Sequence, residues 1–377
     1  MTSSEHVPEG AIAAEAPAPG RAGTYKYDKL LQARSRRAKA MAPDQAMSPA
    51  HVRDVILADL DARTGSRGEW RIEGETIRAR ESWVFKARTP LAPWPLAVKV
   101  YCTAVGAELS MHQLQLLWRF HEAMAGEPSL TVPVPWAALP EHRTVIMQWV
   151  DEPRVDVLLQ CAGRRRDERA RLMAAAGRWL RRFHAHSGVT VLPLSPKPLL
   201  QQIETRLIGD GDVRRRIFDG VFRRSHEVLQ RRLAAYAGTP IPHVLAHGDF
   251  VSHNLFHGPE RTVGFDVAGR HTSPVTRDIF RFLVHAESEK PFFTRPSTLA
   301  STGIEQQDRE AFLSAYGPLD PTLDDSLLAV LQLAEVLYRW SVLLDRLRRG
   351  RINRDRIVKV IRLRRMAKYA VATLEGR

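Results

Sequence analysis

Apolar residues first recur at helical spacing just after position 48, where Ser48 and Pro49 supply a capping residue and a favourable first position. They are Val52, Val55, Ile56 and Leu60. Three short segments that predict strands follow, and the last two are rich in β-branched and aromatic residues. The segments are 70–74, 82–87 and 96–101. A further helix, opened by Glu108, follows the third strand.

The second half of the chain has a different pattern. Residues 144–150 are mostly apolar and predict a buried strand, and much of the chain after it has apolar residues three and four apart. The predicted helices include one that ends at His184–His186 and later ones at 309–317, 327–344 and 352–374. This pattern predicts an α+β protein with a small β-rich part at 46–147 and a larger, mostly helical part at 148–377. Residues 1–45 are rich in Ala, Pro and Gly and then basic, and they predict a disordered basic tail.

Composition limits the class of protein. The chain has 377 residues, 44% hydrophobic, which is ample for a buried core. No uninterrupted apolar run is long enough to span a membrane, and the acidic N-terminus is unlike a secretory signal. Cys102 and Cys161 lack the spacing of a zinc site or a disulfide framework. We therefore expect a cytoplasmic protein.

The formal net charge of +14 comes mainly from arginine clusters such as Arg164–Arg166 and Arg214–Arg216. Such clusters can attract anions, although arginines on solvated helix faces would give the same charge. No nucleic-acid-binding motif accompanies them, so we expect no specific nucleic-acid partner. Peripheral contact with an anionic membrane through the basic surface stays open, with residues 25–40 as one candidate segment. The sequence leaves the oligomeric state open.

The strongest chemical signal is the segment 247–256, His-Gly-Asp-Phe-Val-Ser-His-Asn-Leu-Phe, followed by Asp266 at the end of a short apolar run. Phosphoryl transfer needs a residue beside the attacking hydroxyl and oxygen ligands for magnesium. Asp249 fits the first role, and Asn254 and Asp266 fit the second. Each residue alone could be a turn or strand-end residue, but the ordered set favours a phosphotransfer centre. We expect the two segments to form a hairpin that brings these side chains together.

The pattern His-Gly-Asp-x4-Asn-Leu followed by Asp resembles the aminoglycoside phosphotransferase and choline kinase family, relatives of the protein kinases. The resemblance implies a two-lobed protein-kinase-like fold, with a small antiparallel β-lobe carrying one helix and a large, mostly helical lobe. It also implies ATP and Mg²⁺ as cofactors and a small-molecule hydroxyl as phosphate acceptor. By the same resemblance, Asp278 is a buried aspartate that braces the catalytic loop, although a helix N-cap is an alternative role.

The resemblance implies further nucleotide contacts in the first part of the chain. Lys99 matches the strand lysine that holds the α- and β-phosphates, although an edge-strand lysine is the alternative. Glu108 is the candidate partner of Lys99. No Gly-x-Gly-x-x-Gly loop is present, so covering of the phosphates falls to the loop from Gly74 to Ser82. Backbone groups from Met147 to Val150 are expected to bind adenine, in the strand that becomes the hinge between the lobes.

The acceptor side is less defined. Arg270 and His253 are candidate substrate residues, and His247 is read as a scaffold residue of the loop. Because arginines stud the second part of the chain, we expect a neutral or anionic acceptor, such as a sugar, a metabolite or a glycolipid head group. An aminoglycoside kinase is one alternative, and a nucleotide-binding kinase-like module without turnover is another. A protein kinase is disfavoured because Asp266 is followed by Val-Ala instead of Phe-Gly.

Overall fold

The computed structural model describes residues 49–65, 68–79, 81–206, 220–267, 269–348, 351 and 353–376. The chain divides into two compact units. Unit 1 comprises residues up to Gly126 together with Val132–Asp151, and unit 2 comprises Glu127–Thr131 together with Glu152–Arg377. The predicted tail at 1–45 and the arginine cluster at 214–216 lie outside the described residues.

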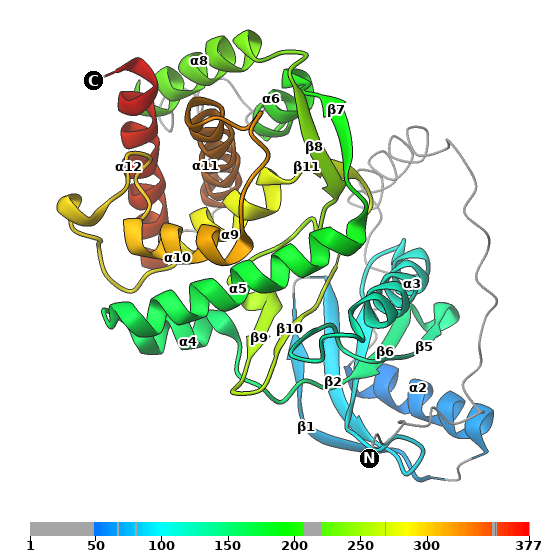
Figure 1. Ribbon diagram of the computed structural model, residues 1–377. Helices are drawn as coiled ribbons and strands as arrows, with labels where there is room; N and C mark the ends of the chain where they lie inside the picture. The colour runs from blue at the N-terminus through cyan, green and yellow to red at the C-terminus, as the bar shows by residue number, and fades with distance from the viewer. Residues whose placement is uncertain are drawn as a thin grey trace. The chain divides into compact units, whose positions relative to one another are not determined.

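Unit 1 contains a five-stranded antiparallel sheet with strand order β1-β2-β3-β6-β5 (Figure 1). The strands are β1 (Arg71–Arg78), β2 (Ser82–Arg88), β3 (Leu96–Tyr101), β5 (Pro135–Leu139) and β6 (Thr144–Gln148). The four strands predicted from the sequence are all present. The prediction of a loop from Gly74 to Ser82 is wrong, because β1 continues to Arg78. Gly74 adopts a φ of 73° where the pairing of β1 with β2 shifts register, so the glycine absorbs the irregularity and the strand goes on.

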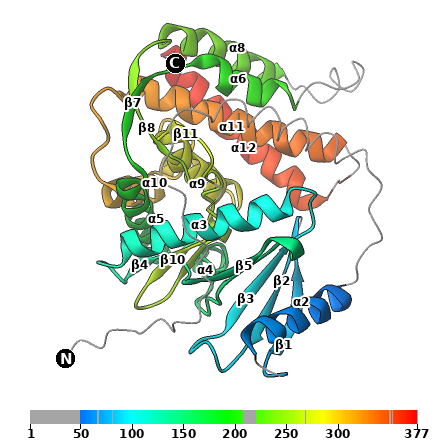
Figure 2. The ribbon, with the colours of Figure 1, turned by 90° about the vertical axis from the view of Figure 1, so that its right-hand side faces the viewer.

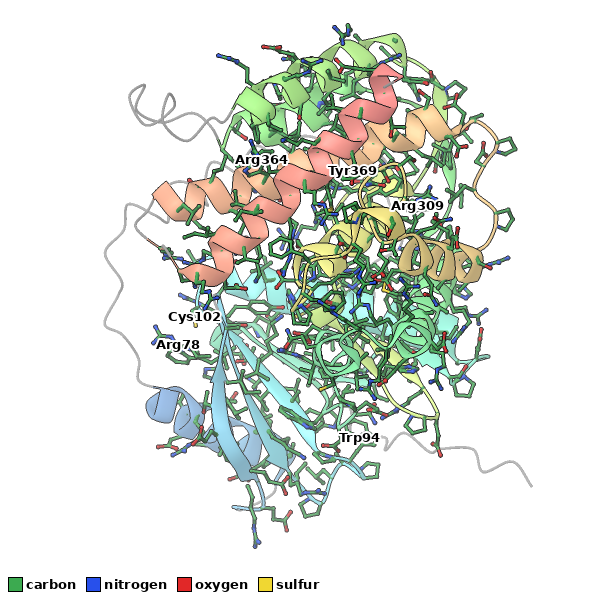
Figure 3. All side chains as sticks on the ribbon, turned by 90° about the vertical axis from the view of Figure 1, so that its left-hand side faces the viewer. Arg78, Trp94, Cys102, Arg309, Arg364 and Tyr369 are labelled. Carbon is green, nitrogen blue, oxygen red and sulfur yellow. The ribbon has the colours of Figure 1, made fainter. Side chains whose placement is uncertain are left out.

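Two helices accompany this sheet in the described part of unit 1, α2 (Pro49–Thr64) and α3 (Gly106–Met124). Ile56 and Leu60 of α2 belong to one apolar cluster with Phe85, Val98 and Ile146 of the sheet. The helical spacing after position 48 therefore marks a core-facing stripe, and α2 adds a second helix to the one expected for the small β-lobe. Cys102 and Arg78 are labelled at the ends of β3 and β1, and both cysteines of the chain are free thiols (Figure 3).

Unit 2 contains two small sheets. In the first, β4 (Leu130–Thr131) pairs parallel with β10 (Thr262–Gly264), which pairs antiparallel with β9 (Leu255–His257). The predicted hairpin of 255–256 with 262–265 is therefore confirmed. The second sheet has the order β11-β8-β7 and was not predicted. Its strands are β7 (Thr190–Pro193), β8 (Pro240–Leu245) and β11 (Thr272–Pro274). They are short and contain prolines, which weakens any strand signal in the sequence.

Helices make up most of the rest of unit 2 (Figures 1 and 2). They are α4 (Val155–Ala162), α5 (Arg166–Ser187), α6 (Pro196–Glu204), α8 (Gly220–Ala235), α9 (Thr276–Ser288), α10 (Gln306–Tyr316), α11 (Asp325–Arg348) and α12 (Arg354–Glu375). Helices α5 and α10 lie side by side, and a side chain at Gly177 would collide with the Phe312 carbonyl, so glycine permits this close approach. Arg364 and Tyr369 project from α12 (Figure 3).

Helix α11 is long and apolar enough to cross a membrane by length and composition alone. However, 78% of the relevant window, within Asp325–Leu347, is buried inside the structure. Its apolar residues include Leu333, Val336 and Leu337, none of which is exposed. This is the pattern of the central core helix of a helical unit.

Candidate active site

The segment between β8 and β9 carries the predicted catalytic residue, and its backbone explains its sequence. Gly248 has a φ of 85°, in the left-handed region that favours glycine. The residue before it, His247, is fully buried, whereas Asp249 after it is exposed. The glycine therefore lets the chain turn from the interior to the surface within one residue. The structure places the Asp249 carboxylate in solvent at the end of this turn.

Asp278, in the first turn of α9, holds the loop through its carboxylate. Its Oδ2 accepts a hydrogen bond from the His247 N–H at 2.7 Å, and its Oδ1 accepts one from the Gly248 N–H at 3.2 Å. Asp278 is the third residue of α9 and the position before the helix is Val275, so Asp278 is not the N-cap residue. Both loop amides on either side of the turn are thus fixed by one buried side chain.

The charge state of Asp278 follows from its partners. Burial raises the pKa of this carboxyl, but the hydrogen bond with His184 and the positive charge of Arg281 lower it to about 2. His184 Nε2 lies 3.2 Å from Asp278 Oδ2, and His184 Nδ1 lies 2.9 Å from the Tyr316 hydroxyl. When Nε2 donates a hydrogen bond to the Asp278 carboxylate, Nδ1 accepts a hydrogen bond from the Tyr316 hydroxyl. Asp278 is therefore ionised at neutral pH.

His247 is part of the aromatic core. Its ring packs at 5.8 Å from Trp179, 5.7 Å from Phe183 and 5.5 Å from Phe250, measured between ring centroids. Burial lowers the pKa of His247 despite the nearby carboxylates, led by Asp278. A neutral, enclosed imidazole suits a scaffold position, and neither ring nitrogen lies at the surface.

Arg281 is a supporting residue that the sequence reasoning missed. Its NH1 donates to the Gly248 carbonyl, and its Nε donates to Glu335 Oε1 on α11 at 3.2 Å. Burial lowers the pKa of Arg281, but Glu335 raises it, and the net pKa is above its ordinary value. Arg281 follows Asp278 by three positions, so both lie on one face of α9. That spacing was visible in the sequence, but the direction of the face was not.

The two predicted magnesium ligands lie on the β9–β10 hairpin. Asn254 is buried, and its Nδ2 donates to the Asp249 carbonyl at 2.9 Å and lies 3.4 Å from Asp249 Oδ2. This leaves the side-chain oxygen of Asn254 to act as a metal ligand. The Phe265 N–H donates to the Asn254 carbonyl at 3.1 Å, which brings Asp266 next to Asn254. The donor set of amide and carboxylate oxygens fits Mg²⁺.

Asp266 also has an unusual backbone. Its φ is 60°, one of two positive values among non-glycine residues in the described parts of the chain. Left-handed conformations cost most residues 1 kcal/mol or more, although aspartate tolerates them better. Asp266 is half-buried. The next residue, Val267, is buried and anchors the chain on that side of the turn. The strained turn therefore aims a carboxylate at a defined position instead of ending a strand in solvent.

The two candidate substrate residues differ in their surroundings. His253 lies in the turn Ser252–Asn254, is half-buried, and packs its ring 5.2 Å from that of His285. Burial lowers the pKa of His253, with Asp249 opposing the shift. Arg270 is half-buried and follows Gly269 on the segment leading to β11. The structure brings His253 next to the Asp249–Asn254 pair and places Arg270 four residues beyond Asp266.

The predicted nucleotide residues all lie in unit 1. Lys99 is buried on β3, with its amino group 5.0 Å from the centroid of the Tyr101 ring. Since β3 lies between β2 and β6, the alternative of an edge-strand lysine is wrong. Glu108 is exposed in the first turn of α3, and Ser82 is buried as the first residue of β2. The pairing of Lys99 with Glu108 stays a prediction.

The predicted adenine-binding segment is the end of β6. Met147 and Val150 are both buried. The Gln148 N–H donates to the Val134 carbonyl at 2.8 Å, and the Trp149 N–H donates to the Pro95 carbonyl at 2.7 Å. The backbone donors of Gln148 and Trp149 are therefore already used inside unit 1.

No protein-family model matches the sequence, and no curated protein matches it. Solved structures do match. A choline/ethanolamine kinase family protein from Mesorhizobium loti has a TM-score of 0.56 at 14% identity, covering 86% of this chain and 100% of that chain. Amicoumacin kinase in complex with AMP-PNP and Ca²⁺ has a TM-score of 0.56 at 12% identity, and the match covers 90% of this chain and 95% of that chain.

A putative aminoglycoside phosphotransferase from Ralstonia eutropha has a TM-score of 0.55 at 15% identity, covering 86% of this chain and 98% of that chain. Identities this low demonstrate a shared fold. The fold expected from the His-Gly-Asp motif is thereby confirmed, and the chain has the protein-kinase-like α+β fold of the choline/ethanolamine kinase and aminoglycoside phosphotransferase structures.

Proposed function

We propose that this protein is an ATP- and Mg²⁺-dependent phosphotransferase that acts on a hydroxyl group of a small molecule. The observation that carries the proposal is the loop held by Asp278, which presents an exposed Asp249 beside Asn254 and next to the strained Asp266. The similar structures include small-molecule kinases, and one of them holds AMP-PNP and Ca²⁺.

In this proposal, the oxygen of the acceptor hydroxyl attacks the γ-phosphorus of ATP. Asp249 accepts the proton that this hydroxyl loses. The new oxygen–phosphorus bond forms while the bond to the leaving ADP oxygen breaks, so ADP and a phosphorylated acceptor are the products. The Asn254 amide fixes Asp249 through the 2.9 Å bond to its carbonyl. Asn254 and Asp266 would hold Mg²⁺, and the ion would screen the charge that develops on the phosphates.

Unit 1 contributes the nucleotide contacts in this proposal. Lys99 supplies the phosphate cation from a buried central strand, a position that solubility alone would not favour. Glu108 orients Lys99, and Ser82 lies at the strand end after the phosphate-covering turn. Because Gln148 and Trp149 already donate inside unit 1, the adenine-facing donor falls to Val150.

We propose that the acceptor is neutral or anionic, such as a sugar, a metabolite or a glycolipid head group, and that it is not an aminoglycoside. A polycation needs carboxylates that are free to pair with it. Glu287 is instead paired with Lys290 at 2.6 Å. Glu289 is paired with Arg339 at 2.8 Å and with Lys359 at 2.6 Å. His253 and Arg270 are the proposed acceptor contacts beside Asp249.

The test compares the parent with Asp249→Asn in ATP binding and in turnover on a panel of alcohols. We expect unchanged Mg-ATP affinity and a turnover lower by about two to four decades, the usual scale for a positioned acid–base group. Asp167→Asn, an exposed carboxylate on α5, is the matched control and should keep full turnover. Nucleotide binding by the parent without turnover on any acceptor would favour the kinase-like binding module instead. Turnover of aminoglycosides alone would overturn the acceptor class.

A further inference from the structure

A pocket in unit 2 lies between α6, β11, α9 and α11, and it is separate from the Asp249 turn itself. The cavity itself is small, about 30 Å³, and it opens to solvent. The polar side chains that line it come from three helices: Gln202 from α6, Thr276 and Arg277 from α9, and Glu335 and Tyr338 from α11. Leucine, alanine and proline side chains complete the wall. A cavity of this size has room for one small polar group of a ligand, with the rest of the ligand outside it.

Arg277 is the notable charge in this pocket because its partners are neutral. Its NH1 donates to the Ser273 hydroxyl at 3.1 Å, and its NH2 donates to the Gln202 side-chain oxygen at 3.1 Å. Among the described residues, no carboxylate forms an ion pair with Arg277. Burial, and after it the neighbouring Arg281, lower the pKa of Arg277, while Glu335 opposes the shift. A half-buried guanidinium whose direct partners are both neutral can take an anion as a further partner.

The carboxylate nearest to this pocket is already used. Glu335 accepts a hydrogen bond from Arg281 Nε at 3.2 Å, and both side chains are buried. Arg206 adds a further positive charge, since its guanidinium lies 5.1 Å from the Tyr338 ring centroid and its NH2 donates to the Tyr338 hydroxyl at 3.2 Å. The lining itself carries one positive and one negative charge, Arg277 and Glu335, and the surrounding Arg206 and Arg281 add positive charge.

Arg281 also connects the pocket to the catalytic loop. Its guanidinium lies 5.2 Å from the centroid of the Tyr338 ring on the pocket side, and its NH1 donates to the Gly248 carbonyl on the loop side. Gly248 directly precedes Asp249. Arg281 therefore contacts both the wall of the pocket and the loop that carries Asp249.

We propose that Arg277 binds an anionic group, a carboxylate or a phosphate, carried by the molecule whose hydroxyl is phosphorylated. This inference rests on the proposed phosphotransferase function and narrows its acceptor to an anionic metabolite. The planar guanidinium can present two parallel N–H groups to two oxygens of such a group, and Thr276 and Tyr338 line the same space. A neutral sugar would offer the Arg277 guanidinium no charged partner.

The first experiment measures binding of inorganic phosphate to the full-length protein by calorimetry at constant ionic strength, without nucleotide. Arg277→Gln removes the charge, and we expect phosphate affinity to fall about tenfold or more, the range for hydrogen bonds to charged groups. Gln202→Glu is the second variant. It places a carboxylate 3.1 Å from the guanidinium, so it should fold at least as stably as the parent and compete with phosphate. Arg223→Gln, an exposed arginine on α8, is the matched control and should bind phosphate like the parent.

The second experiment compares acceptors that differ only in the anionic group, such as glycerol 3-phosphate against glycerol and glycerate against propane-1,2-diol. We expect KM to be lower for the anionic member in the parent and this preference to vanish in Arg277→Gln, with ATP affinity unchanged. Unchanged ATP affinity separates this pocket from the nucleotide phosphates.

Three results would overturn the inference. They are the absence of saturable phosphate binding to the parent, phosphate affinity in Gln202→Glu equal to that of the parent, and equal KM values for charged and uncharged acceptors. The last result, combined with Arg277-dependent phosphate binding, would assign the pocket to free anions. If no acceptor is turned over, the phosphotransferase proposal fails while the phosphate titrations still decide whether the pocket binds anions.

Discussion

Asp278→Asn tests the support of the catalytic loop. The change keeps the shape of the side chain but removes the charge, and it replaces one of the two oxygens that accept hydrogen bonds from His247 and Gly248. An amide nitrogen at that place would face a backbone N–H, donor against donor. We therefore expect the variant to lose both the charge-assisted bond and part of the loop's order.

The magnitude follows from the pKa of Asp278. A pKa of about 2, against an ordinary value of 3.8, means that ionisation of this buried carboxyl stabilises the folded protein by about 2 kcal/mol. The mismatched donor adds about 1–3 kcal/mol for an unsatisfied buried group. We expect the free energy of unfolding at pH 7 to fall by about 3–5 kcal/mol in Asp278→Asn.

The pH dependence gives a second, independent readout. Since the folded-state pKa is depressed, the stabilisation is complete above about pH 4 and is lost as the pH falls toward 2. Asparagine does not titrate, so the stability difference between parent and variant should narrow over that window. A carboxylate with only a steric role would give a difference that does not change with pH.

Urea unfolding followed by tryptophan fluorescence measures both quantities. Asp167→Asn, which changes an exposed aspartate on α5, is the control and should stay within about 0.5 kcal/mol of the parent. Equal unfolding free energies for Asp278→Asn and the parent at pH 7 would refute the assignment of Asp278 as the residue that holds the loop.

Three further changes test other parts of unit 2. Asp266→Ala should remove the magnesium dependence of ATP binding, measured by calorimetry with and without Mg²⁺, and Mg-ATP affinity equal to that of the parent would exclude Asp266 as a ligand. Gly264→Ala should destabilise the protein by about 1–3 kcal/mol in urea, because a methyl group there would collide with the Trp179 ring, and an unchanged midpoint would contradict the close approach of hairpin and α5. Lys290→Met should lower the free energy of unfolding by about 3–5 kcal/mol, because the buried amino group pairs with three carboxylates of α9, α10 and the segment between them. An unchanged free energy of unfolding would show that these carboxylates are protonated or hydrated.

The sequence determined the elements whose signal is local. The spacing of apolar residues identified α2, β2, β3 and β6, and the hairpin of β9 with β10 followed from two short β-prone runs around a turn. The His-Gly-Asp motif is also a local feature. Its glycine, Gly248, adopts the φ of 85° that the turn requires. Such features depend on neighbouring residues only, so a sequence pattern suffices to predict them.

Other features were missed because they depend on residues far apart in the chain. The sheet of β7, β8 and β11 joins segments separated by dozens of residues, and its short strands carry little β signal of their own. The extension of β1 to Arg78 depends on pairing with β2, which compensates for a glycine that locally indicates a loop. Pairing energy between strands, which no local pattern reports, decided both.

The site divides in the same way. Sequence alone nominated Asp249, Asn254 and Asp266, because the chemistry of phosphoryl transfer limits which side chains can serve and in which order they occur. Only the tertiary structure showed that Asp278 reaches back thirty or so residues to two loop amides, that Arg281 holds the Gly248 carbonyl, and that Arg277 faces a pocket without a carboxylate partner. The reason is physical: a side chain's identity fixes what it can bind, whereas burial and the packing of distant helices fix its direction, its partners and its pKa.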